Sequence, residues 1–246
     1  MSKSRLLNTL EMKSSQVPKW VNQSYSQYEQ VVTEPTFPCF FGQKGERSGE
    51  LRYSYLSHND WSSLPSTLNS FLQLMETDPL VRRGLFLFIE PEEKEQSLHY
   101  YHRYFWDILQ YLNKHDPSDW PSHTPNNPEN YLWSFCFAGK SMFAFANAPA
   151  YKQRVTRDLG QSMVIGFQPR EIFKGLEGTE PKGVNSREAV RKRVEAWDQI
   201  PKHPDISHYG DKDHREWKQF FISDDCEPEK GSCPFQAKNV PKVDFP

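Results

Sequence analysis

The sequence predicts an α+β fold: a single domain with a mixed, mainly antiparallel sheet packed by helices and followed by an irregular C-terminal arm. Helical and strand-like segments mix along the chain without the strict alternation that a doubly wound sheet requires. A length of 246 residues suits one large domain with its own core. The C-terminal part is polar and carries several prolines, which favours irregular structure there.

Helices are predicted from apolar residues that recur with a period of 3.6 and from local capping signals. The helix "SREAVRKRVEAWD" is expected to begin at Ser186 as its N-cap, with Glu188 close behind it. A short helical stretch is expected within "DHREWKQFFI". The predicted helices span residues 18–32, 61–76, 95–113, 186–198 and part of 213–222.

Strands are predicted where apolar and aromatic residues alternate or form short runs. "YLWSFCFAGKSMFAFAN" reads as a hairpin, because two alternating aromatic runs flank Ala138, Gly139 and Lys140. "GLFLFIE" is a short apolar run typical of a buried strand. Segments rich in proline and glycine predict loops. The predicted strands lie in 50–56, 84–90, 131–147 and 162–167, and the loops in 35–50 and 116–130.

Composition narrows the class of protein. Aromatic residues make up 14% of the chain, which suits a ring-built core and a pocket for a flat apolar ligand. The net charge of -2, with both signs interspersed, argues against a nucleic-acid partner. No apolar run approaches the roughly 20 residues of a membrane span, and we find no signal-peptide core, so we expect a cytoplasmic protein. The four cysteines are then expected to be reduced, and none forms a CxxC pair for zinc.

The helix "HYYHRYFWDILQYLNKHD" holds three of the eight histidines. A 3.6-residue period places His102 on an apolar stripe, with His99 nearly one turn before it. A neutral imidazole on such a face can bind a metal or a haem iron, or it can be a core histidine bonded to a backbone carbonyl. Neither HExxH nor Glu-x-x-His accompanies the pair, so a zinc or di-iron carboxylate site has little support. The stripe consists of Leu98, His102, Phe105, Trp106, Leu109 and Leu112.

Five blocks of the chain, taken in order, resemble the YqcI/YcgG family. They are "FPCFFGQKGERSGELRYSYL", "YLWSFCFAGKSMFAFANAPAYKQRVTR", "FQPREIF", "HPDISHYGDKDHREWKQFFISDD" and "CPF". The blocks fall within residues 37–235, so we expect residues 1–246 to form one such domain, with 1–17 and 236–246 as terminal extensions. The resemblance implies a haem b protein, because characterised relatives include haem-dependent N-oxygenases that hydroxylate a nitrogen of arginine or of another guanidine- or amine-bearing metabolite.

The resemblance also implies candidate ligands of the iron. A histidine four positions before a helix tryptophan in relatives is matched by His102 and Trp106, which makes His102 the first choice as axial ligand. His203, in "HPD", is the alternative. The chain departs from many relatives at His214, where they carry asparagine. Thiolate ligation by Cys39 or Cys233 ranks below imidazole, since neither is flanked by a basic run that would depress its pKa, and Cys136 reads as inert core.

Basic and aromatic residues in the matched blocks are candidates for holding the haem and the substrate. Arginine suits the two haem propionates, although each arginine can equally belong to an ordinary surface ion pair. Lys218 and Gln219 can orient a carboxylate or dock the C-terminal arm. The candidates for cofactor binding are Arg52, Trp106, Arg154, Arg157 and Arg170, and those for substrate binding are Trp217, Lys218 and Gln219.

The leading hypothesis is therefore a haem-dependent N-oxygenase for a small nitrogen substrate, with Phe105, Trp106 and the 131–145 hairpin lining an apolar pocket. No GxGxxG fingerprint is present, so electrons must come from an external ferredoxin- or flavodoxin-type donor, unless peroxide is the oxidant. The alternative is a non-catalytic haem protein for sensing, storage or delivery. A cysteine-dependent hydrolase using Cys39 and a plain interaction domain are weaker readings. The ring-rich composition makes a homodimer plausible.

Overall fold

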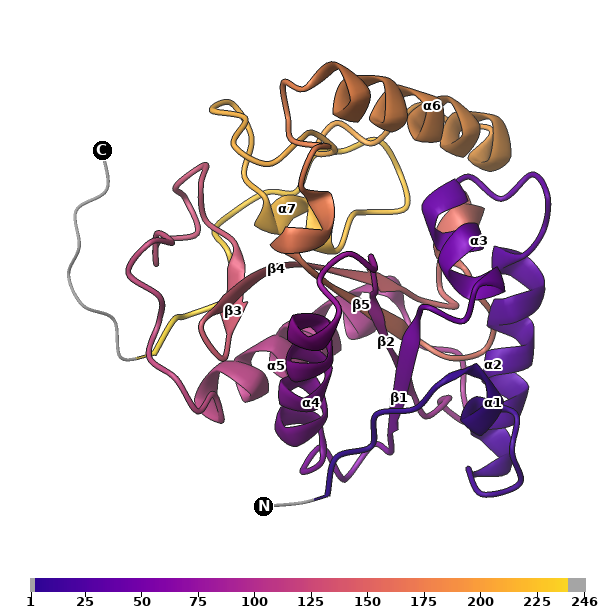
Figure 1. Cartoon of the computed structure of the whole chain (residues 1–246). Coiled ribbons are helices and arrows are strands. Elements are labelled where there is room, and N and C mark those ends of the chain that lie inside the picture. Colours follow the sequence, from indigo (N-terminus) through magenta and orange to yellow (C-terminus); the bar gives the residue numbers. More distant parts are fainter. Residues whose placement is uncertain (1–2, 239–246) are drawn as a thin grey trace.

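The computed structural model describes residues 3–238 and confirms the predicted α+β class (Figure 1). Its centre is a mixed five-stranded sheet with strand order β1-β2-β5-β4-β3. Strands β1 and β2 are parallel, as a crossover through helix α4 allows, and the other three pairings are antiparallel. The strands are β1 (Arg52–Leu56), β2 (Leu85–Ile89), β3 (Phe135–Phe137), β4 (Lys140–Asn147) and β5 (Val164–Pro169).

Helices cover both faces of the sheet, which gives two hydrophobic cores. Strand β2 is buried along its whole length, as its continuous apolar run predicts. Its residues alternate between the cores: Leu85 and Leu87 face the core with α4, α5 and α7, whereas Phe86 faces the core with α2. The helices are α1 (Thr9–Met12), α2 (Lys19–Val32), α3 (Phe40–Arg47), α4 (Leu64–Thr77), α5 (Leu98–Lys114), α6 (Pro181–Asp198) and α7 (Trp217–Phe220), with short 3₁₀ turns at Val155–Arg157 (η1) and Arg170–Phe173 (η2).

The predicted hairpin is confirmed as β3 and β4. Its two-residue turn uses Ala138 and Gly139, with φ of 49° and 73°. Positive φ at both turn residues matches the right-handed twist of the strands it joins. Next to it, Gly166 of β5 is required by packing, because a Cβ there would lie 2.4 Å from the ring of Phe145.

Three helices differ from the prediction, the first being the short α1, which lies in the segment expected to be a terminal extension. The loop expected at 35–50 contains α3, which Cys39 caps through its Sγ, an acceptor for the Gly42 N–H at 3.3 Å. Helix α6 begins at Pro181 instead of after Ser186, since proline at the first helical turn lacks only an N–H that has no partner there. In Figure 1, α6 lies across the top of the molecule, away from the sheet.

Both ends of the described chain are bound to the domain. Leu7 exchanges two backbone hydrogen bonds of 2.8 Å with Tyr53 of β1, so the segment expected to be an extension adds to the sheet edge. The C-terminal arm is irregular, as predicted, and it is anchored: Phe235 lies in the core, and the Gln236 carbonyl accepts hydrogen bonds from Gln110 and Asn113 of α5. Within residues 3–238, we find no helix with the length and apolarity needed to cross a membrane.

Candidate functional site

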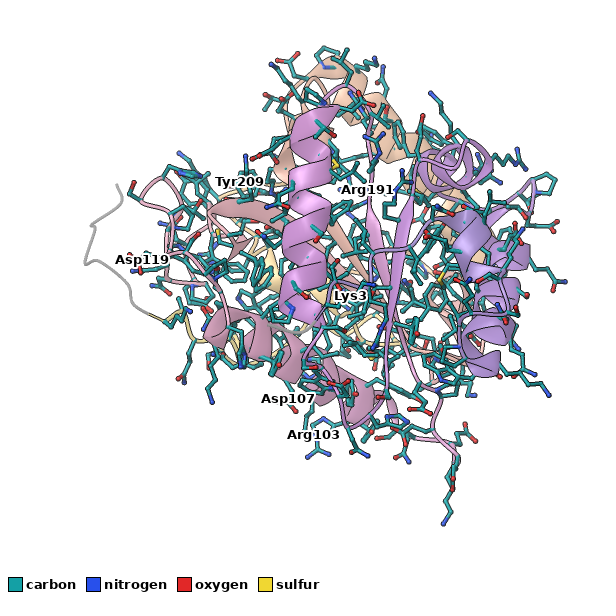
Figure 2. All side chains as sticks on the ribbon, turned by 60° about the horizontal axis from the view of Figure 1, so that its bottom comes forward. Lys3, Arg103, Asp107, Asp119, Arg191 and Tyr209 are labelled. Carbon is teal, nitrogen blue, oxygen red and sulfur yellow. The ribbon has the colours of Figure 1, made fainter. Side chains whose placement is uncertain are left out.

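Helix α5 positions the histidine that ranks first in the sequence. Ser97 caps its start, because the Ser97 Oγ accepts the Tyr100 N–H at 3.2 Å. Arg103 and Asp107 point away from the protein on the outer side of the helix (Figure 2). The buried face is turned slightly from the predicted stripe, so that Leu98 and His102 lie at its edge. Its buried members are Tyr101, Phe105, Trp106, Ile108, Leu109, Leu112 and Asn113.

His102 is a partly exposed imidazole in an aromatic setting. Its Nε2 accepts a hydrogen bond from Trp106 Nε1 at 3.0 Å, one helical turn further along α5. The ring edge of Phe221 meets it at a centroid distance of 5.3 Å, and His99 stacks at 6.4 Å. Burial, with a smaller contribution from His99, lowers the pKa of His102 to about 4. The ring is therefore neutral near pH 7, as a metal ligand must be.

Trp106 is held by α7. Its indole stacks on Phe220 with an interplanar angle of 22° and meets Trp217 at a centroid distance of 6.3 Å. Rings of the 131–145 hairpin reach the same place, since Phe143 and Trp133 both contact Phe220. The rings expected to line a pocket thus pack against one another. Any group bound at His102 must approach from the part of its ring that solvent reaches.

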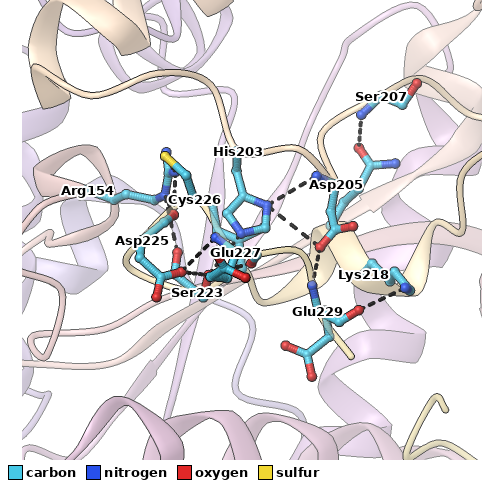
Figure 3. Close-up of polar contacts among 12 residues, drawn as sticks. Arg154, His203, Asp205, Ser207, Lys218, Ser223, Asp225, Cys226, Glu227 and Glu229 are labelled. Carbon is cyan, nitrogen blue, oxygen red and sulfur yellow. Dashed lines mark hydrogen bonds and ion pairs between the residues drawn. The ribbon is translucent and has the colours of Figure 1, made fainter. Parts of the chain in front are cut away.

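The segment 220–226 connects the two candidate histidines. Phe221 contacts His102, and the hydroxyl of Tyr151 donates to the Ile222 carbonyl at 2.6 Å. Two residues further along, Ser223 contacts His203 (Figure 3). The same short segment of the chain therefore contacts both histidines that the sequence proposes as iron ligands.

His203 is buried, with 1% of its surface exposed, and both ring nitrogens have partners (Figure 3). The Asp205 backbone N–H donates to Nδ1 at 3.2 Å, and Nε2 lies 3.0 Å from Ser223 Oγ. An accepting Nδ1 places the proton on Nε2, so His203 donates to Ser223. Burial is the main cause that lowers the pKa of His203 and keeps it neutral.

Ser223, His203 and Asp205 resemble a Ser-His-Asp triad in composition but not in geometry. The Asp205 carboxylate lies 3.7 Å from Nδ1, beyond hydrogen-bond distance, and instead accepts the Glu229 N–H at 2.7 Å. The Ser223 hydroxyl donates to Asp225 at 2.6 Å. A triad histidine must take the serine proton on Nε2, the nitrogen that is already protonated here. This group therefore has a structural role.

The candidate arginines do not meet at one place. Arg154 is buried and donates to the carbonyls of Pro201, Ser223 and Asp225, which fixes the 220–226 segment against η1 (Figure 3). Arg157, beside it in sequence, donates to the Ala146 carbonyl at 2.9 Å.

Arg170 pairs with Glu216 and lies 3.9 Å from the ring centroid of Tyr209, while Arg52 donates to carbonyls at the start of β1, the edge strand. Binding of haem propionates by these four arginines stays a prediction.

The three candidate substrate residues have structural partners. Trp217 is buried in the aromatic core beside Trp106. Lys218 Nζ donates to the Glu229 carbonyl at 2.8 Å, and Gln219 Oε1 accepts the Ser207 N–H at 3.1 Å. The Lys218 contact joins α7 to the chain that follows it, and the Gln219 contact joins α7 to the loop before it. A role of the three residues in substrate binding stays a prediction.

Metal sites built from several protein ligands, or from a cysteine thiolate, find little support among the described residues. Among residues 3–238, no group of three or more His, Cys, Asp or Glu side chains could hold a metal ion. All four cysteines are free, and burial raises the pKa of Cys39 and raises that of Cys233 to about 12, which disfavours a thiolate. Haem iron can be held by a single protein imidazole, and this role of His102 stays a prediction.

The fold and this site define an α+β protein whose first-choice histidine is neutral, partly exposed and surrounded by aromatic rings. The chain belongs to the YqcI/YcgG family, whose sequence profile matches residues 28–236. No solved structure matches the chain significantly.

Two relatives from Bacillus subtilis (strain 168) cover nearly the whole chain. The uncharacterized protein YqcI is 34% identical over 243 residues, with 94% of each chain covered. The uncharacterized protein YcgG is 32% identical over 240 residues, again with 94% of each chain covered. A more distant relative is DcsA of Streptomyces lavendulae, whose name assigns it provisionally as an N(omega)-hydroxy-L-arginine synthase. It is 27% identical over 232 residues, which cover 90% of this chain and 86% of DcsA.

Proposed function

We propose that this protein is a haem-dependent N-hydroxylase that acts on a nitrogen of a small guanidine- or amine-bearing molecule. The observation that carries the proposal is His102: a neutral, partly exposed imidazole on α5, without further side chains to complete a protein-only metal centre in the described part of the chain. The name of DcsA supports the reaction class, because it describes hydroxylation of a guanidine nitrogen.

The donor chemistry of His102 fits haem. Bound haem would supply the oxygen activation, and His102 would hold its iron. Phe221 and Trp106 close the core side of His102 against water, which lowers the local dielectric and keeps the imidazole neutral. Electrons would come from a separate ferredoxin- or flavodoxin-type protein, or peroxide would replace them together with dioxygen.

Haem binding is tested first. The protein is produced with a haem precursor, and its Soret band is followed through gel filtration for the wild type, His102→Ala and His99→Ala. His99 is the matched control, since it is an exposed histidine on the same helix. We expect His102→Ala alone to lose haem. A folded, colourless wild type that takes up no added hemin would exclude the proposal.

Turnover is tested second. The haem-loaded protein is mixed with arginine, other guanidines and amines, together with a reductant and dioxygen or with peroxide. Mass spectrometry should show one added oxygen atom on one of these substrates. Stable haem binding without any product across this panel would instead support a haem carrier or sensor.

A further inference from the structure

The hydrogen bond between Trp106 and His102 occupies the site at which a metal would bind. A neutral imidazole has one protonated nitrogen and one nitrogen with a lone pair. Trp106 Nε1, which can only donate, lies 3.0 Å from His102 Nε2. Nε2 therefore carries the lone pair and Nδ1 the proton. Iron also binds through the lone pair, so Trp106 and iron compete for the same nitrogen.

The position of the Trp106 indole depends on the packing of α7. Trp106 is buried, with 5% of its surface exposed, and it contacts both Phe220 and Trp217. Buried aromatic pairs of this kind resist reorientation, because the rings are in close contact. This packing fixes the indole N–H, so the bond opens when the His102 ring turns away or when the rings between α5 and α7 rearrange.

We propose that Trp106 is a latch on His102: in the haem-free protein its indole N–H holds the nitrogen that iron needs, and haem enters only when this bond breaks. The inference rests on the proposed function and adds a positioning residue to it. The latch fixes the tautomer of His102, keeps its lone pair from other metals, and lowers the apparent affinity for haem by the strength of one hydrogen bond.

The test compares two tryptophans of the same aromatic cluster. Trp106→Phe keeps a ring in place and removes the N–H. Trp133→Phe is the matched control. The hairpin that carries Trp133 was expected to line the pocket, but the structure buries this ring in the core against Phe220, and its Nε1 has no hydrogen-bond partner. Haem-free wild type and both variants are titrated with hemin, and the Soret band gives the Kd and the uptake rate. Circular dichroism checks that each variant is folded.

We expect Trp106→Phe to bind hemin roughly two- to tenfold more tightly than wild type, the range that one net hydrogen bond gives. Trp133→Phe should match the wild type. An unchanged or weaker affinity of Trp106→Phe overturns the latch, and so does an equal gain in Trp133→Phe. If wild type binds hemin through His102 and Trp106→Phe binds it no better, the proposed function stands and only the latch fails. If neither protein takes up hemin, both proposals fail.

A measurement on the wild type alone keeps the inference testable if Trp106→Phe does not fold. Nitrogen NMR of the haem-free protein distinguishes the two tautomers of His102. We expect the proton on Nδ1 and a lone pair on Nε2. A proton on Nε2 would show that Trp106 does not occupy that nitrogen and would overturn the latch.

Discussion

His102 and His203 are both neutral histidines that contact the 220–226 segment, yet their hydrogen bonds differ. His203 is buried, and partners from two different loops engage both its nitrogens. His102 reaches solvent and has one hydrogen bond, from a residue of its own helix. A change of partner costs His203 two buried hydrogen bonds, whereas it costs His102 a single local one. The comparison separates a structural histidine from a functional candidate.

The largest expected effect concerns the arginine that fixes the His203 side. Arg154→Ala should lower the free energy of unfolding by about 3–5 kcal/mol, because three carbonyls lose their donor and a large buried side chain is removed. Urea denaturation measures it. Arg103→Ala, on the exposed side of α5, should stay within about 0.5 kcal/mol of wild type. A loss below about 1 kcal/mol for Arg154→Ala would mean that the 220–226 segment is held in another way.

The two histidines should differ in their cost to stability. His203→Ala should remove about 2–3 kcal/mol of stability, since Ser223 and the Asp205 N–H lose their buried partner. His102→Ala should remove about 1 kcal/mol, because its single bond is local and water can reach the site. Denaturation curves of both variants at pH 7.5 provide the comparison. Equal losses would contradict the division into structural and functional histidines.

The pH dependence of stability gives a smaller effect with a defined sign. The pKa of His102 falls from its ordinary 6.5 to about 4 in the folded protein, so the unfolded chain takes up a proton first as the pH falls. Stability is therefore fully present above pH 6.5 and decreases toward pH 4. Solvent screening at the exposed part of the ring reduces the effect to about 1–2 kcal/mol.

Between pH 6.5 and pH 4, the stability of His102→Gln should therefore fall by about 1–2 kcal/mol less than that of the wild type. Denaturation at a series of pH values measures this difference. His123→Gln, on the surface, is the control and should follow the wild type. If His102→Gln keeps the full pH dependence of the wild type, the surroundings of His102 do not lower its pKa. The pKa of His203 is lowered as well, so the His102→Gln variant should retain part of the pH dependence of stability.

The smallest effect concerns the arm that covers the His203 side. Lys218→Met should cost about 0.5–1 kcal/mol, because it removes the donor to the Glu229 carbonyl but keeps the apolar part of the side chain. Lys152→Ala, which breaks the exposed pair with Glu95, should cost less than about 0.5 kcal/mol. Thermal unfolding compares the two. A larger effect at Lys152 would indicate that surface charge, and not the arm, determines stability here.

Periodicity predicted most of the sheet and the long helices, since the apolar residues of β2 and α5 match the faces they bury. It failed where a cap or proline decides a boundary. Helix α3 depends on the Cys39 Sγ as its cap, and α6 begins on Pro181, neither of which gives an apolar pattern. The edge pairing of Leu7 with Tyr53 joins distant segments through backbone atoms, which the side-chain sequence does not reveal.

The site was less predictable because its contacts come from distant segments. Spacing alone placed His102 and Trp106 one turn apart on α5, and the structure confirms that they touch. Nothing local to α5 indicates Phe221, which lies more than 100 residues further along the chain. The sequence suggested that Arg154 binds a haem propionate or forms a surface ion pair. In the structure it donates to backbone carbonyls that are distant in the sequence. Family resemblance supplied the interpretation that periodicity did not.

The anchoring of Gln236 on α5 has a consequence for biosynthesis. Gln110 and Asn113 obtain their partners only from the last part of the described chain, so α5 cannot complete its packing until that part has left the ribosome. The helix that carries His102 therefore completes its packing only after residue 236 has been synthesised.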